Sequence, residues 1–219
     1  MATARSTISA GETLRNVDWA TYCKLRDDPA NDHLRMTYLD GDLTIVSPHL
    51  VHDIDSRGIM IVVMSVARAY RIRFLAVGTT TLRKEGRGPL PGAGKEPDEG
   101  FYLGDVVARV RGKTELDLSI DPPPTLALEV DNSGHSQAAL PAYVRIGVPE
   151  VWRFDVNEQA LWFGRLDGDH YEEIGRSVSL PRLTPTLVLQ ALEARGQEPD
   201  DIDWLDWLDR WARALPEPV

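Results

Sequence analysis

The alternation of apolar and polar positions predicts a β-hairpin followed by a long helix in the first third of the chain. Leu43 and Ile45 alternate with polar residues after Asp40-Gly41, a dipeptide that favours the tight turn of a hairpin. Ser47-Pro48 then precedes apolar residues at helical spacing, which predicts a helix over about 49–69.

Apolar segments farther along predict the remaining strands and helices. Strands are expected over 74–77, from 101, and over 126–130, 150–155 and 160–166; helices are expected within 12–28, over 135–146 and 186–194, and after a cap at Asp200 or Asp201. The Gly- and Pro-rich residues 84–97 are expected to form a loop. This interleaving of strands and helices predicts a mixed α/β fold.

Length and composition narrow the class of protein. A chain of 219 residues with 42% hydrophobic and 26% charged residues suits one domain with appendages. We expect one domain over 1–195 with an N-terminal helical arm, and an acidic Trp-rich tail over 196–219. A single cysteine, Cys23, excludes an internal disulfide and a Cys-rich zinc site. Without a membrane-spanning run or a secretory pattern, the expected location is cytoplasmic, with no membrane contact.

The formal net charge of −10 is unevenly distributed. Residues 196–219 contain seven acidic and two basic residues, a net charge of −5, whereas residues 68–95 contain seven basic and one acidic residue, a net charge of +6. The total argues against a general nucleic-acid coat, because phosphate binding needs clustered cations. The basic stretch is consistent either with an anionic partner or with a solvated face.

Carboxylates near two predicted strands are candidates for a metal site. Asp98 lies just before the strand that starts at 101, and Glu129 lies in the apolar strand Leu126-Ala-Leu-Glu-Val. Asp131 is two residues after Glu129 and therefore faces the same side of a strand. A buried acid needs a neutralising partner, and Mg²⁺ prefers oxygen ligands, so these acids and the Val130 carbonyl are possible ligands. Alternatively, Asp98 caps a turn, Glu129 pairs with an arginine and Asp131 starts a loop.

The histidines carry a weaker signal. His49 and His52 are one turn apart at the start of the long helix, where they either bind a metal or phosphate or are simply exposed. The chain has no Gly-x-Ser-x-Gly motif, Walker loop or dinucleotide fingerprint.

Four segments resemble the Uma2-type restriction endonuclease family, which is similar to the PD-(D/E)XK nuclease superfamily. They are Tyr38-Leu-Asp-Gly-Asp-Leu-Thr-Ile-Val-Ser-Pro followed by His52, Glu96-Pro-Asp-Glu-Gly-Phe-Tyr-Leu, Asp121-Pro-Pro-Pro-Thr-Leu-Ala-Leu-Glu-Val-Asp and Gly147-Val-Pro-Glu-Val-Trp-Arg-Phe-Asp. The resemblance covers roughly residues 14–195. It implies a restriction-endonuclease-like fold, in which helices flank a central mixed sheet with a metal site at its edge.

The resemblance also implies residue roles. Pro97-Asp98 matches the "PD" element, Glu129 matches the following acid, and Asp131 takes the third position of the E-x-K element. The family lysine, four residues before the tyrosine that matches Tyr143, is replaced by Ala139. Lys95, Gln137 and Arg145 are possible substitutes for it.

The implied activity is metal-dependent hydrolysis of phosphodiester bonds in nucleic acid, with DNA as the expected substrate. Asp98, Glu129 and Val130 would hold Mg²⁺ or Mn²⁺, Asp131 would join them or accept a proton, and His52 completes the candidate catalytic set. The candidate nucleic-acid contacts are Arg83, Lys84, Arg87 and Lys95. Because of Ala139, a weakened nuclease that only binds or assembles is the alternative, and hydrolysis of another phosphate ester is a third possibility.

The tail offers a possible interface. Trp204, Trp207, Leu208 and Trp211 share one face of the predicted final helix. This face is expected to pack on its own domain, although Trp-rich faces also favour interfaces, so a homodimer is a second expectation.

Overall fold

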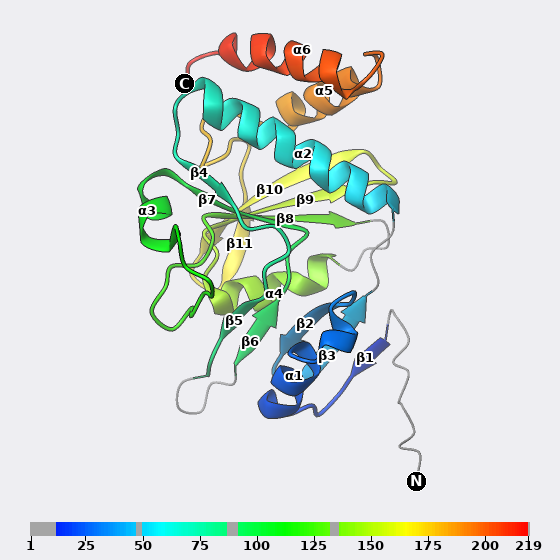
Figure 1. Cartoon of the computed structure of the whole chain (residues 1–219), viewed down its shortest axis with the longest axis vertical. Coiled ribbons are helices and arrows are strands. Elements are labelled where there is room, and N and C mark those ends of the chain that lie inside the picture. The colour runs from blue at the N-terminus through cyan, green and yellow to red at the C-terminus, as the bar shows by residue number, and fades with distance from the viewer. Residues whose placement is uncertain (1–11, 47–49, 87–91, 132–135, 219) are drawn as a thin grey trace.

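The computed structural model describes residues 12–46, 50–86, 92–131 and 136–218, and it places two sheets among layers of helices (Figure 1). The first sheet has the order β1-β3-β2-β6-β5, with β1 Glu12–Leu14, β2 Arg35–Leu39, β3 Asp42–Val46, β5 Leu82–Lys84 and β6 Ala93–Lys95. The second sheet has the order β11-β10-β9-β8-β7-β4, with β4 Phe74–Ala76, β7 Glu99–Leu103, β8 Leu126–Asp131, β9 Glu150–Asp155, β10 Ala160–Asp167 and β11 His170–Glu173.

The predicted hairpin is confirmed by β2 and β3, which pair antiparallel around Asp40 and Gly41. Both turn residues have positive φ, 50° and 91°, as a type I′ turn requires. The helix expected within 12–28 is shorter than predicted: Glu12–Leu14 is a strand that pairs with β3, and α1 covers Trp19–Arg26. The Asp18 side chain caps α1 at the Thr21 N–H, which explains where this helix begins.

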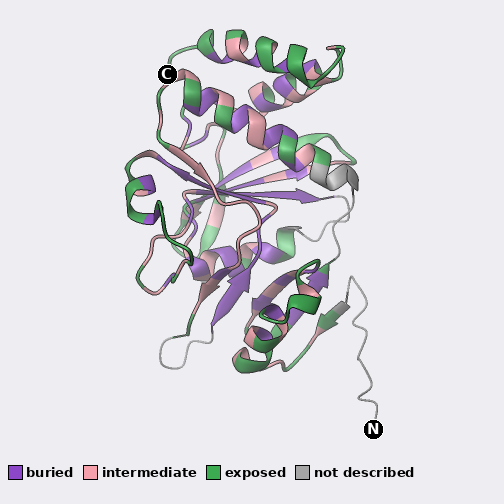
Figure 2. Cartoon of the chain, in the orientation of Figure 1, coloured by how far each residue is buried: buried purple, intermediate pink, exposed green. Residues whose placement is uncertain are grey.

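The second sheet is mixed, as predicted for the fold class. β8 pairs parallel with β9 and antiparallel with β7. α4 (Ser136–Ile146) connects the two parallel strands and covers one face of this sheet. α2 (Leu50–Ala69) and α5 (Pro185–Arg195) cover the other face, and α6 (Asp201–Arg213) packs on the outer side of these two helices. Every residue of β7 and β8 is buried, and Figure 2 shows this central layer.

The C-terminal helix α6 packs on its own chain, as its apolar face predicts. Trp204 and Leu208 are fully buried in the core formed with α2 and α5, whereas Trp207 and Trp211 are partly buried. Asp200 caps the helix at the N–H groups of Ile202 and Asp203. None of the helices in the described ranges is long and apolar enough to cross a membrane.

The segment predicted as a loop over 84–97 contains strand β6, so this expectation is wrong. Ala93-Gly94-Lys95 shows no apolar alternation, and it is a strand because it pairs with both β2 and β5. A Cβ at Gly94 would lie 2.1 Å from the Tyr22 hydroxyl oxygen, so only glycine allows this close packing. β4, predicted as a buried strand, is a half-buried edge strand.

Candidate functional site

Glu129 lies in β8, and Asp98 lies just before β7, where the chain crosses from the first sheet to the second. Glu99 of β7 pairs with Leu128 of β8 at the end of this antiparallel ladder, so Asp98 lies beside the part of β8 that contains Glu129. Two hydrogen bonds fix Asp98: its N–H donates to the Leu128 carbonyl at 3.1 Å, and its Oδ2 accepts the Val130 N–H at 2.8 Å. The two acids singled out from sequence are therefore brought together by strand pairing.

Glu129 is buried in a polar network. Its Oε1 accepts a hydrogen bond from the Tyr143 hydroxyl of α4 and lies 3.0 Å from the Lys95 Nζ of β6. Burial raises the pKa of the Glu129 carboxyl to about 7, and the charge of Asp98 acts in the same direction, while Lys95 and the Tyr143 hydrogen bond oppose the rise. The carboxyl is therefore poised to bind a cation when it loses its proton.

Lys95 is a cation inside this network. Its side chain is 7% exposed, and its Nζ also donates to the Glu96 carbonyl at 2.8 Å. Among the substitutes considered for the missing lysine, Lys95 contacts Glu129, whereas Gln137 is exposed and Arg145 pairs with Asp40 at 3.3 Å. Ala139 is buried against Tyr143 and Ala127. The first sheet therefore supplies a positive charge to the site.

Glu96 anchors the crossover between Lys95 and Asp98. Its carboxylate accepts hydrogen bonds from the Met36 N–H and the Thr81 hydroxyl, both at 2.9 Å, and it pairs with Arg26 at 3.4 Å. These partners come from β2, the loop before β5, and α1, so they fix the backbone on both sides of the site.

Asp131 lies on the same face of β8 as Glu129 and is buried. Within the described ranges, however, no group of three or more His, Cys, Asp or Glu side chains could hold a metal ion, so the structure does not gather Asp98, Glu129 and Asp131 into one cage. Two carboxylates still fit a divalent cation, because Mg²⁺ is commonly held by one or two carboxylates and several waters.

The residues predicted to contact nucleic acid lie in different environments and have different partners. Arg83 pairs with Asp27 at 2.7 Å, and the Lys84 Nζ donates to the Ile146 carbonyl at 3.1 Å. Lys95 is in the buried network, and Arg87 lies outside the described residues. His49 is also outside them; His52 belongs to α2, but its side chain is not among those described.

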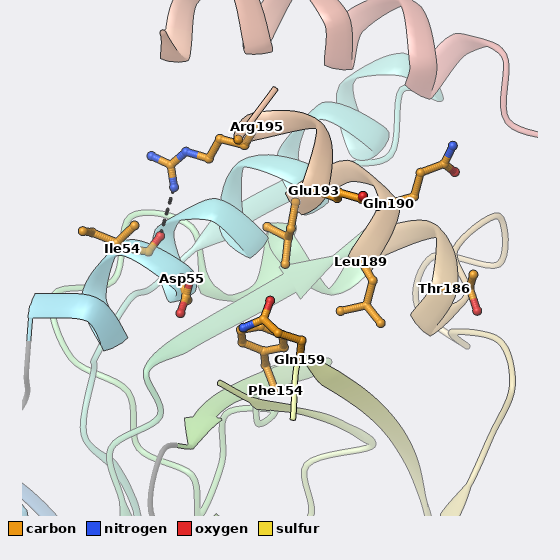
Figure 3. Close-up of a pocket in the computed structure, with 11 residues that line it drawn as sticks. Ile54, Asp55, Phe154, Gln159, Thr186, Leu189, Gln190, Glu193 and Arg195 are labelled. Atoms are coloured by element: carbon orange, nitrogen blue, oxygen red, sulfur yellow. Dashed lines mark hydrogen bonds between the residues drawn. The ribbon is translucent and has the colours of Figure 1, made fainter. Parts of the chain in front are cut away.

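A pocket of about 580 Å³ lies away from these residues, between the start of α2, β9 and α5 (Figure 3). Ile54, Phe154 and Leu189 contribute apolar lining. Arg195 at its rim is held by Asp201 at 2.8 Å and by the Ile54 carbonyl at 3.2 Å. None of the predicted site residues lines this pocket, and its chemistry does not identify a reaction.

Several residues of the site were not found by sequence reasoning. The sequence analysis used Tyr143 only to locate the position of the family lysine. It named Glu96 only as the first residue of a segment that resembles the family. Glu99, next to Asp98, is 1% exposed and pairs with Arg57 of α2 at 2.5 Å. Burial raises the pKa of Glu99, and Arg57 opposes that rise. The strand alternation could have revealed that Glu99 faces the opposite side of the sheet from Asp98.

These observations define an α+β protein with two carboxylates beside the central strands of a mixed sheet and a buried lysine supplied by the other sheet. The Uma2 family, described as "Putative restriction endonuclease", matches residues 19–197, and the chain belongs to this family. By that description it is a nuclease family.

Comparison with solved structures finds a protein described as a putative nuclease belonging to DUF820 from Anabaena variabilis. It is 16% identical, covers 79% of this chain and 90% of its own, and superposes with a TM-score of 0.41. No curated protein matches the chain.

Proposed function

We propose that this protein is a Mg²⁺- or Mn²⁺-dependent endonuclease that hydrolyses phosphodiester bonds, with DNA as its substrate. The supporting observation is that Asp98 bonds to Leu128 and Val130, the two residues that flank Glu129, and that the buried Lys95 amine lies 3.0 Å from Glu129. Family membership supports the nuclease class. The metal is inferred from the chemistry of these side chains, and DNA as the substrate is inferred from the description of the family.

The residues divide the work as follows. Asp98 and Glu129 would hold the cation, which when bound lowers the pKa of a water and polarises a phosphoryl oxygen. The Lys95 ammonium stabilises negative charge that grows on the phosphate. Tyr143 and Glu96 orient Glu129 and the crossover. Asp131, buried on the same face of β8 as Glu129, is a candidate to accept the proton of the attacking water.

Plasmid nicking tests this proposal. Purified protein should convert supercoiled plasmid to the nicked form with Mg²⁺ or Mn²⁺ and not with EDTA. Asp98→Asn should lower the rate by at least about a hundredfold, because it removes a charged ligand of the cation. Asp169→Asn, at a fully exposed acid, is the matched control and should leave the rate unchanged. Equal rates in wild type and Asp98→Asn would identify a contaminating nuclease and refute the proposal.

A protein that binds nucleic acid without cutting it is the second candidate, and Ala139 is the observation that favours it. The Cβ of Ala139 cannot supply a cation, although Lys95 brings one from the other side. Calorimetry separates the two functions: a nuclease of this kind binds Mn²⁺, whereas the binding protein has no need of the metal. Turnover by the wild type on any nucleic acid would exclude this second function.

A further inference from the structure

We propose that Arg57 and Arg35 form an anchor for a DNA backbone phosphate next to the scissile one, and that Glu99 is the residue that positions Arg57. This inference rests on the proposed nuclease function and deepens it, because it assigns the contact with the substrate backbone. It moves that contact from Arg83 and Lys84, which bond to groups of their own chain, to the edge of the central sheet.

Glu99 and Arg57 form an ion pair that connects the start of β7 to helix α2. Glu99 directly follows Asp98, and its side chain faces the helix layer rather than the Glu129 side. Its carboxylate is 1% exposed and lies 2.5 Å from the guanidinium of Arg57, whose side chain is 57% exposed. A buried acid thus holds an arginine whose outer N–H groups reach solvent near the Asp98 end of β7.

The second carboxylate oxygen of Glu99 lies in an unusual environment. In the described part of the chain, Glu99 Oε2 is buried and has no hydrogen-bond partner. Burying a carboxylate with one unmatched oxygen costs stability. Arg57 contacts only the Oε1 atom of this carboxylate.

Arg35 of the first sheet also contributes a positive charge that acts on Glu99. It is the first residue of β2, beside Met36, whose N–H binds Glu96 in the crossover. The positive charges of Arg35 and Arg57 both act on Glu99, as does the negative charge of Asp98. Two arginines from different layers therefore balance the charges of Glu99 and Asp98, and Arg57, which contacts Glu99, keeps an exposed guanidinium where a backbone would approach.

Other arginines of the chain differ in the partner that they bind. Arg73, for example, pairs at 3.0 Å with Asp105, an acid that is 99% exposed. Exposed ion pairs of this kind are weak and readily exchange with solvent. Guanidinium groups bind phosphate through several N–H donors in a fixed plane, so the held Arg57 is the better phosphate ligand.

Salt-dependent DNA binding tests the anchor. A short fluorescent duplex is titrated with full-length protein in Ca²⁺ at several salt concentrations, using wild type, Arg57→Gln, Arg35→Gln and the control Arg73→Gln. We expect Kd to rise about tenfold for each of the first two variants, and the slope of log K against log salt to fall by about 0.9 per lost phosphate contact. The control should match wild type.

Two further readouts separate anchoring from folding and from catalysis. Arg57→Lys should recover part of the affinity, and Glu99→Gln should weaken binding at an unchanged melting temperature. In nicking assays Arg57→Gln should raise KM and leave kcat within about twofold, because the anchor binds substrate and transition state alike.

The outcomes distinguish this inference from the proposed function. Wild-type affinity and salt slope in both Arg57→Gln and Arg35→Gln would overturn the anchor, as would a wild type that binds no duplex. Arginine-dependent binding by a protein that cuts nothing would support the anchor and refute the nuclease. Cleavage that does not depend on either arginine would refute the anchor alone.

Discussion

Glu129 is the residue whose protonation should control metal binding. Its buried carboxyl has a pKa of about 7, so it must release a proton before it binds a cation. Mn²⁺ affinity should therefore rise about tenfold between pH 6 and pH 8 and level off above that. Calorimetry in buffers of different ionisation enthalpy should detect the released proton. In Glu129→Gln the pH step should vanish; an equal affinity of the wild type at both pH values would contradict this assignment.

Lys95 should be the cation on which the rate depends. Lys95→Met should lower nicking by about 10² to 10³-fold, the range seen when one donor to a developing charge is removed. Adding Ala139→Lys should restore part of the rate, since position 139 lies one turn before Tyr143 on the buried face of α4. Melting curves show whether both variants fold. A folded Lys95→Met with the wild-type rate would exclude this role.

For single residues, the sequence patterns identify the two acids of the site but not the side chains that contact them. Asp98 and Glu129 were found because they precede or end apolar strands, and pairing then brought them together. Lys95 is 34 positions from Glu129 and belongs to the other sheet, so no spacing rule connects them. Arg57 and Glu99 were missed for the same reason: their contact depends on how α2 crosses the sheet.

Strand β6 is the element that carries Lys95 into the site, and Gly94 is its most constrained residue. Gly94→Ala should destabilise the fold by about 1–3 kcal/mol, the usual cost of overpacking, because the new Cβ meets the Tyr22 ring. Gly175→Ala has open space around its Cβ and is the control, with a change within about 0.5 kcal/mol. Urea unfolding measures both; equal midpoints would show that β6 can move away from α1.

At the element scale, periodicity located elements with apolar patterns and missed those made by pairing. The hairpin of β2 and β3, the buried strand β8 and helix α6 all follow from pattern and turn or cap chemistry. β6 has the sequence Ala-Gly-Lys, and β1 has three residues, so each depends on its neighbours for its conformation. Lys95 was named from sequence as a possible substitute for the family lysine, but its contact with Glu129 depends on the pairing of β6 and was not predicted.

For the whole molecule, helix α6 belongs to the main core. Trp204 is fully buried, and its indole N–H donates to the Ala191 carbonyl at 2.9 Å. Trp204→Ala should cost about 3–5 kcal/mol of unfolding free energy, while Ile202→Ala, at a position 67% exposed, should change it by less than about 0.5 kcal/mol. Chemical denaturation checks both values; a small effect of Trp204→Ala would show that α6 docks loosely.

The homodimer remains a proposal, and light scattering of the full chain tests it. Because α6 buries Trp204 and Leu208 in its own core, deleting 197–219 should unfold or aggregate the protein instead of releasing a folded monomer. A folded, monodisperse truncated protein would contradict the role of α6 in the core.

The central claim is that Asp98 and Glu129 together hold a divalent cation, and a crystal soaked in Mn²⁺ tests it most directly. We expect an anomalous peak bonded to both carboxylates, near the Lys95 amine. No peak between Asp98 and Glu129 in a crystal that has taken up Mn²⁺ elsewhere would contradict it.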